Sequence, residues 1–163
     1  MQKVPFTAGG MKKIRAELEH LKKEARPKVI DAIAEARAHG DLKENAEYHA
    51  AKEQQSFIEG RIRYLDQIIS AAQIIDVTTI PNEGRVIFGV TVDIKHLESE
   101  ELSQYTIVGH EEADISDHKL SVNSPLARAM IGHDVGEEVM VSTPEKGEAY
   151  YEILKVEHLG DQA

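Results

Sequence analysis

The chain of 163 residues is long enough for one or two small domains, and its 41% hydrophobic and 29% charged residues are typical of globular proteins. It contains no cysteine, which excludes disulfides, cysteine-based zinc sites and thiol catalysis. No apolar run resembles a signal peptide or reaches the ~18 residues of a membrane span. We therefore expect a cytoplasmic protein with no membrane partner.

The net charge of -10 is distributed unevenly along the chain. Residues 1–79 contain 13 Lys and Arg against 12 Asp and Glu, whereas residues 80–163 contain 6 against 17. This break supports a domain boundary, and it argues against nucleic-acid binding by the second half, because phosphate contacts need clustered Lys and Arg. A merely solubilising surface and a surface for a basic or apolar protein both remain open for that half.

Two long helices are predicted on either side of residue 40. Before it, apolar or small residues recur near the spacing of one buried helical stripe, at Met11, Ile14, Leu18, Leu21, Ala25, Val29, Ala32, Ile33 and Ala36. After it, the series resumes at Ala46, Ala50, Phe57, Tyr64, Leu65, Ile68 and Ala72. Helices of roughly 25 to 30 residues would form a rod of roughly 40 Å, and the short turn between them makes them antiparallel.

The ends of these helices carry recognisable signals. Thr7 can begin the first helix, and Gly40 can end it in the left-handed conformation. Pro27 removes a backbone donor inside the first helix, so we expect a kink there or two separate helices. The second helix should end near Ile74, followed by a linker over residues 78–84.

Beyond residue 84 the pattern changes to that of strands. Runs rich in Val, Ile, Tyr and Thr predict four strands, over residues 85–95, 105–108, 138–141 and 150–156. One short helix is predicted over residues 124–132, with Ser124 as N-cap, Pro125 at the first helical position and Gly132 past the end. This half should be α+β, a mostly antiparallel sheet with one helix packed on it.

The turn sequence GDLKENAEY, residues 40–48, is the candidate functional site. Asp41 and Glu44 are three residues apart, and Asp41 could simply be the N-cap of the second helix with Glu44 completing a capping box. Alternatively, the rod carries two carboxylates to a place that the globular half cannot enter. Magnesium is coordinated by about six oxygen ligands, so two exposed carboxylates would hold it only together with ligands from a partner. A zinc site at His39 and His49 is a weaker alternative.

Basic and aromatic side chains near the turn have two interpretations. Arg37 and Lys52 lie on either side of the turn and could face a phosphate backbone. They could equally be helix-surface charges, with Lys52 paired to Glu47 or Glu53. Phe57 and Tyr48 are interpreted as packing residues rather than base-stacking residues.

Three segments in both halves resemble the bacterial transcript cleavage factors of the GreA/GreB family. They are ARAHGDLKENAEYHAAKEQQ, which spans residues 36–55, together with DVTTIPNEGRVIFGVTV and SVNSPLARAMIG. The resemblance runs over nearly the whole chain in the family's order. Within the family, the rod's net charge of +1 argues against the GreB-like branch, whose coiled coil is more basic.

The resemblance implies two domains: an N-terminal antiparallel α-helical coiled-coil hairpin over residues 1–77, and a C-terminal α+β FKBP-like domain over residues 78–163. The globular domain, including the motif around residues 121–131, would dock on bacterial RNA polymerase. The hairpin would enter the polymerase's secondary channel and stimulate the polymerase's own cleavage of backtracked RNA. We expect a monomer that is not itself an enzyme.

The resemblance also assigns roles near the tip. Asp41 and Glu44 match the acids that help to hold a magnesium ion shared with the polymerase, and the free protein should bind no cofactor. Arg37 and Lys52 match the basic positions that approach the 3' segment of the nascent RNA. Asn45 and Tyr48 fall in the same motif with a supporting role.

Two other functions stay open at this point. An FKBP-like C-terminal half suggests prolyl isomerase activity. That activity would require an aromatic-lined cleft, and this half contains few aromatic residues. The second alternative is a protein that occupies the polymerase channel and inhibits without promoting cleavage. In that case the acids of the tip would be caps only.

Overall fold

The computed structural model describes residues 3–40 and 45–158. The chain forms two compact units, one made of residues 1–3 and 11–72 and the other of residues 4–10 and 73–163. No helix in the described parts of the chain is long and apolar enough to cross a membrane.

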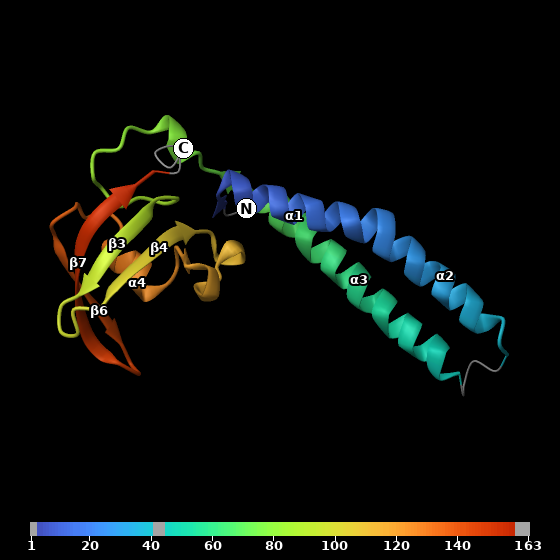
Figure 1. The fold of residues 1–163 in the computed structure, drawn as a ribbon. Helices are drawn as coiled ribbons and strands as arrows, with labels where there is room; N and C mark the ends of the chain where they lie inside the picture. Colours follow the sequence, from blue (N-terminus) through green and yellow to red (C-terminus); the bar gives the residue numbers. More distant parts are fainter. Residues whose placement is uncertain (1–2, 41–44, 159–163) are drawn as a thin grey trace. The chain divides into compact units, whose positions relative to one another are not determined.

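The first unit is an antiparallel helical hairpin, as predicted. Its first arm contains α1 (Ala8–His20), of which residues 8–10 belong to the second unit, the π-helical segment η1 (Leu21–Ala25) and α2 (Arg26–Arg37). Its second arm is α3 (Ala46–Ala71) (Figure 1). The 26 residues of α3 give a length of about 39 Å at 1.5 Å per residue.

The irregularity expected at Pro27 takes the form of the π-helical segment. Pro27 has no N–H to donate to the carbonyl of Lys23, and its ring crowds that carbonyl in a regular α-helix. Immediately before it, Arg26 donates its N–H to the carbonyl of Leu21, five residues back. This wider turn lets the helix continue past the proline, because π-helical bulges redirect backbone hydrogen bonds within a helix.

The core of the hairpin is a narrow seam between its arms. Val29, Ile58 and Ile62 form its centre, with the partly buried Leu18, Leu21 and Ala25 against them. The prediction that Phe57 and Tyr64 belong to this seam is wrong, since their side chains are 75% and 42% exposed. Successive helical residues are turned by about 100°, so Phe57 points away when its neighbour Ile58 faces the other arm.

The second unit contains a five-stranded sheet and one packed helix, the α+β arrangement that was predicted. The strands are β3 (Thr91–His96), β4 (Leu102–Val108), β5 (Lys119–Ser121), β6 (Glu138–Thr143) and β7 (Gly147–Glu157), in the order β5-β4-β3-β7-β6. All neighbouring pairs are antiparallel except β4 with β5. The helix α4 (Pro125–Met130) lies beside the sheet (Figure 1). Its residues Ala127 and Met130 are buried in the core that the sheet forms.

The predicted ends of α4 are confirmed, whereas some strand bounds differ. Ser124 is the N-cap and accepts the N–H of Ala127 at 3.2 Å. The first predicted strand begins at residue 91 rather than 85, because the preceding segment turns at Gly89, which has φ +90. The three-residue strand β5 was not predicted.

A small second sheet contains two short strands. It pairs β1 (Val4–Phe6) with β2 (Ala72–Ile74), where a continuation of the second helix was expected. Three short 3-10 helices complete the described elements, namely η2 (Val77–Thr79), η3 (His110–Glu112) and η4 (Ile115–Asp117).

The segment 4–10 is held within the second unit by Glu112. Its carboxylate accepts the backbone N–H groups of Thr7 at 3.0 Å and Gly109 at 2.9 Å, and also the Thr7 hydroxyl. Thr7 in turn accepts the N–H of Gly10 at 3.0 Å, which is the predicted start of the first helix. The proposed division into domains at residues 77 and 78 stays a prediction.

Candidate functional site

The candidate site lies where α2 ends and α3 begins. After Arg37 the chain leaves the helix, and Gly40 has φ +114, a backbone conformation that residues with a side chain rarely adopt. Asp41 and Glu44, the predicted metal ligands, lie outside the described residues. The geometry of the site is therefore that of its two helical ends.

Asn45 joins those two ends. Its side-chain oxygen accepts the N–H of Tyr48 at 3.0 Å, which makes it the N-cap of α3. Its side-chain nitrogen donates to the carbonyl of Ala36 at 2.6 Å, in the last turn of α2. One amide thus satisfies backbone groups at the beginning of one helix and the end of the other.

This arrangement corrects the capping interpretation of the tip acids. Asp41 is not the N-cap of α3 and Glu44 is not its third residue, because the helix begins after Asn45. The sequence contained the missed signal, since asparagine is among the preferred N-cap residues and stands directly before a helix-forming run. The Asn45 side chain accepts the N–H of Tyr48 in the first turn of the helix.

Tyr48 and Arg37 face each other across the hairpin. The guanidinium carbon of Arg37 lies 5.9 Å from the centre of the Tyr48 ring, within the range of a cation–π contact. The half-buried Tyr48 also meets the ring of His49 edge-on at 5.5 Å. In residues 3–40 and 45–158 no group of three or more His, Cys, Asp or Glu could hold a metal ion, so His39 and His49 belong to no such cluster there.

Arg37 and Lys52, the two predicted RNA-facing cations, line one groove. The groove has a volume of about 260 Å³ and is bounded by Ile30, Ile33, Ala34, Arg37, Lys52 and Gln55. The Lys52 ammonium points to the Gln55 amide oxygen, at 3.5 Å. The expected pairing of Lys52 with Glu47 or Glu53 is wrong, and no carboxylate among the described residues forms an ion pair with either cation.

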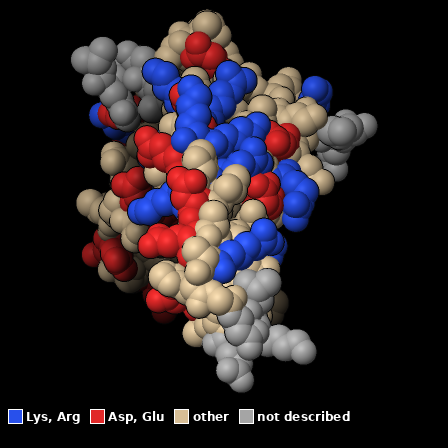
Figure 2. Space-filling model, turned by 90° about the vertical axis from the view of Figure 1, so that its right-hand side faces the viewer, with Lys and Arg blue, Asp and Glu red and all other residues tan. Residues whose placement is uncertain are grey.

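Cations in the middle of the hairpin are bound differently. Arg26 donates to both carboxylate oxygens of Glu59 at 2.7 and 2.8 Å, and Arg61 to both oxygens of Glu17 at 2.8 and 3.1 Å. The Arg26 guanidinium, by hydrogen bonding, holds the pKa of Glu59 below its ordinary value. Figure 2 shows Lys and Arg side chains lying beside Asp and Glu on one face of the molecule.

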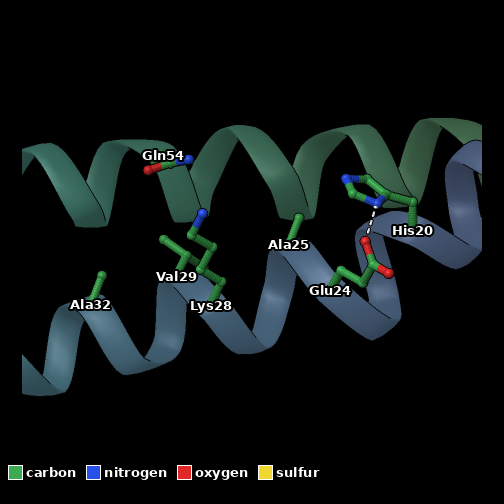
Figure 3. Close-up of a pocket in the computed structure, with 7 residues that line it drawn as sticks. All are labelled: His20, Glu24, Ala25, Lys28, Val29, Ala32 and Gln54. Carbon is green, nitrogen blue, oxygen red and sulfur yellow. Dashed lines mark ion pairs between the residues drawn. The ribbon is translucent and has the colours of Figure 1, made fainter.

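A second groove lies on the hairpin near η1. Its volume is about 380 Å³, and it is lined by His20, Glu24, Ala25, Lys28, Val29, Ala32 and Gln54 (Figure 3). Here the carboxylate of Glu24 lies 2.7 Å from the imidazole Nδ1 of His20. Adjacent residues of α3 thus line different grooves, Gln54 this one and Gln55 the groove of Arg37 and Lys52.

Comparisons with known proteins give one consistent result. Residues 4–74 match the family model described as "Transcription elongation factor, N-terminal", and residues 81–158 match "Transcription elongation factor, GreA/GreB, C-term".

Curated relatives are similar over nearly their whole length. "Transcription elongation factor GreA" of Nitrosococcus oceani is 55% identical over 96% of this chain and 98% of its own, and that of Thioalkalivibrio sulfidiphilus is 56% identical over 98% and 100%. A crystal structure of "GreA factor homolog 1" from Thermus thermophilus covers 95% of this chain and 99% of its own, at 26% identity and a TM-score of 0.43.

Proposed function

This chain belongs to the GreA/GreB family of transcription elongation factors, and on that premise we propose that it stimulates RNA polymerase to hydrolyse backtracked nascent RNA. The hairpin would enter the secondary channel of the polymerase, and the globular unit, including residues 121–131, would dock outside it. The chemistry would belong to the polymerase, so this chain would be a stimulating factor rather than an enzyme. A cytoplasmic monomer fits this role.

Asp41 and Glu44 are the residues that would hold the shared magnesium ion. Two carboxylates suit magnesium, which prefers oxygen ligands, but they leave most of its coordination shell to a partner. When bound, the ion would lower the pKa of a water molecule and stabilise charge on the phosphodiester.

The described residues support three contributions by this chain. Asn45 fixes the separation of the two helical ends from which the segment 41–44 starts and to which it returns. Arg37 and Lys52 present positive charge on the same end of the hairpin, where RNA phosphates can be bound. Tyr48 lies against the Arg37 guanidinium and restricts where that charge can lie.

The observation that carries this proposal is the cap of α3. Because Asn45 is the N-cap of α3, neither Asp41 nor Glu44 is, so N-capping does not account for the two acids of the tip. This favours a chemical role for the tip over simple occupation of the channel.

A cleavage assay on stalled elongation complexes tests the proposal. Purified polymerase halted in a backtracked position is incubated with and without this chain, and shortened RNA is measured over time. We expect the chain to accelerate release of the RNA 3' fragment. Inhibition of elongation with no added cleavage would instead show that the chain only occupies the channel.

A further inference from the structure

The two edges of the five-stranded sheet differ in how they are protected. The strand β5 forms one edge with three residues, and its outer side is occupied because Asp114 exchanges both backbone hydrogen bonds with Lys119. The strand β6 forms the other edge with six residues (Figure 1). Its sequence EVMVST contains neither lysine nor proline, two residues that commonly keep an edge strand from pairing further. The edge at β6 therefore lacks the protection that β5 has.

The hydrogen bonds between β6 and β7 show which backbone groups of β6 point outward. Ile153 of β7 donates its N–H and accepts another at 3.0 and 2.8 Å, in both cases with residues just before β6. This direction alternates along an antiparallel strand, so Val139, which lies opposite Tyr151, bonds to β7. The backbone groups that point away from β7 are those of Glu138, Met140 and Ser142.

These three residues form an open row at the edge of the sheet. In residues 3–40 and 45–158, no group on the open side of β6 forms a hydrogen bond with their N–H or C=O groups. Their side chains are exposed, whereas Val139 and Val141 between them are buried. An extended peptide can add to such an edge through main-chain hydrogen bonds, the mode of recognition called β-augmentation.

The charges on the exposed face indicate what such a peptide should carry. Glu138 lies directly opposite Glu152, whose other neighbour in the same row is Lys95 on β3. Like charges directly opposite each other on paired strands are destabilising. Glu138 forms no ion pair with another residue of the described globular unit. A cation on the open side of β6 would therefore complete this row.

The two neighbouring rows extend the pattern. Met140 lies opposite Tyr150, and both side chains are 47% exposed. An aromatic side chain beside Met140 would cover part of both and make a favourable contact with the sulfur. Ser142 lies opposite the exposed Glu148, so a second cation suits that row. The three rows together favour a segment with two cations on either side of an apolar or aromatic residue.

We propose that β6 is a docking edge for an extended basic segment of another protein, which adds to the sheet as a sixth strand. In antiparallel order, the segment carries a cation opposite Ser142, an apolar or aromatic residue opposite Met140 and a cation opposite Glu138, with one residue between each. The 17 acidic against 6 basic residues of positions 80–163 attract such a segment over a longer range. This inference concerns the globular unit and does not depend on the proposed action of the hairpin.

A second copy of this chain fits the same edge less well. Hydrogen-bonded pairing of two β6 strands would set Met140 opposite Met140 and Glu138 opposite Ser142. Each Glu138 would still face no cation in its row, and two acidic units would be brought together. A basic segment avoids both effects.

The probe for this edge is the synthetic peptide TKVYVRT with acetylated and amidated ends, titrated into the full chain and followed by NMR. In antiparallel order its lysine, tyrosine and arginine would lie opposite Ser142, Met140 and Glu138. We expect the backbone amides of these three residues to exchange quickly with solvent in the free chain. Added peptide should shift their signals and slow their exchange.

Methylated peptides test the direction of the hydrogen bonds on the wild-type chain. Methylation of the tyrosine nitrogen should abolish binding, because that N–H would donate to the carbonyl of Met140. Methylation of the valine directly before it should leave most of the binding, since that N–H points away from β6. Equal loss of binding from both peptides, or unchanged β6 amides in the presence of the unmodified peptide, would overturn the docking edge.

Charge variants test the register of the partner. Glu138→Lys should raise the peptide Kd by about three- to tenfold, and a peptide with glutamate in place of its arginine should restore binding. Glu98→Lys makes the same change of charge in the exposed turn after β3 and should bind nearly as wild type. Equal effects of the two variants would overturn the pairing with Glu138. Amide protection that rises with protein concentration without peptide would show a second copy at this edge and overturn the basic partner.

Discussion

Cationic side chains in the middle of the helical hairpin form ion pairs with the other arm, whereas among the described residues those at its tip end do not. In the middle, Arg26 and Arg61 each make two hydrogen bonds to a carboxylate on the other arm, to Glu59 and Glu17. At the tip end, Arg37 and Lys52 lie in a groove and form no ion pair with a described carboxylate. The arginines in the middle therefore have their anionic partners within the chain, whereas the cations at the tip end are available to a binding partner.

This difference separates residues that maintain the hairpin from residues that meet a partner. Substitutions in the middle should change stability and leave function intact, and substitutions of the tip cations should do the reverse. Asn45 is the exception, because it belongs to the tip end and also holds the two helices together. The following predictions test that separation.

The largest effect is expected at the tip acids. Asp41→Ala or Glu44→Ala should reduce factor-stimulated cleavage by at least about 10- to 100-fold, the usual loss when groups that support a bound metal are removed. Binding to polymerase and the melting temperature should stay nearly unchanged, because Asn45 caps α3. Cleavage rate, competition binding and thermal unfolding are the measurements.

Two controls make that result specific. Glu53→Ala removes an exposed acid elsewhere on α3 and should retain full activity. A magnesium titration should show partial rescue of the tip variants at high magnesium, because the shared site would be weakened rather than abolished. If polymerase binding and cleavage fell in parallel, the acids would be docking residues and the metal role would be contradicted.

Asn45→Ala should destabilise the hairpin by about 2 kcal/mol, from the lost N-cap and the lost hydrogen bond to Ala36. Cleavage should fall as well, since the helical ends would no longer be tied. Asn45→Asp keeps an acceptor for the first turn of α3 but cannot donate to Ala36, so it should lose about half as much stability. Equal stability of all three proteins in urea unfolding would contradict the geometry of this amide.

Arg37→Ala and Lys52→Ala should each raise the concentration for half-maximal cleavage by roughly three- to tenfold, with little change in stability. For each lost phosphate contact the slope of log affinity against log salt should decrease by about 0.7, the value for single strands. Lys23→Ala is the control, because Lys23 pairs with Glu19 on its own arm at 2.8 Å. A salt dependence identical to that of wild type would exclude phosphate contacts by these residues.

The smallest effect on function is expected for Arg26→Ala and Glu59→Ala. Both should lower the melting temperature slightly and leave maximal cleavage unchanged. Since the folded-state pKa of Glu59 is lowered, the pair's contribution is fully present above the ordinary Glu pKa of about 4.3 and is lost as pH falls through the folded-state value. Thermal unfolding of wild type and Glu59→Ala should therefore converge in acid, and a constant difference down to pH 2 would refute this assignment.

Sequence reasoning predicted the elements whose signals are local. The hairpin follows from apolar spacing and Gly40, and α4 follows from Ser124 and Pro125 at its start. The prediction erred where burial depends on a one-residue rotation, as for Phe57 beside Ile58. Apolar residues are not obliged to be buried, so their presence alone does not identify the seam.

Contacts between separate elements could not be predicted from local sequence patterns, for a different physical reason. The hydrogen bond from Asn45 to Ala36 and the pairing of β1 with β2 join residues that the sequence pattern does not relate. The strand β5 has three residues, too few for an alternating pattern to develop. The resemblance supplied the roles of Asp41 and Glu44, whereas the assignment of Asn45 as the N-cap of α3 came from the described geometry.

The attachment of residues 4–10 to the second unit has a practical consequence for chimeric proteins. Phe6 is fully buried and Thr7 is bound by Glu112, so that unit is built from two separate stretches of chain. A graft that joins two relatives at residue 77 would set Phe6 and Thr7 of one parent against Glu112 of the other. Exchanging residues 4–10 together with residues 73–163 keeps these partners from a single parent.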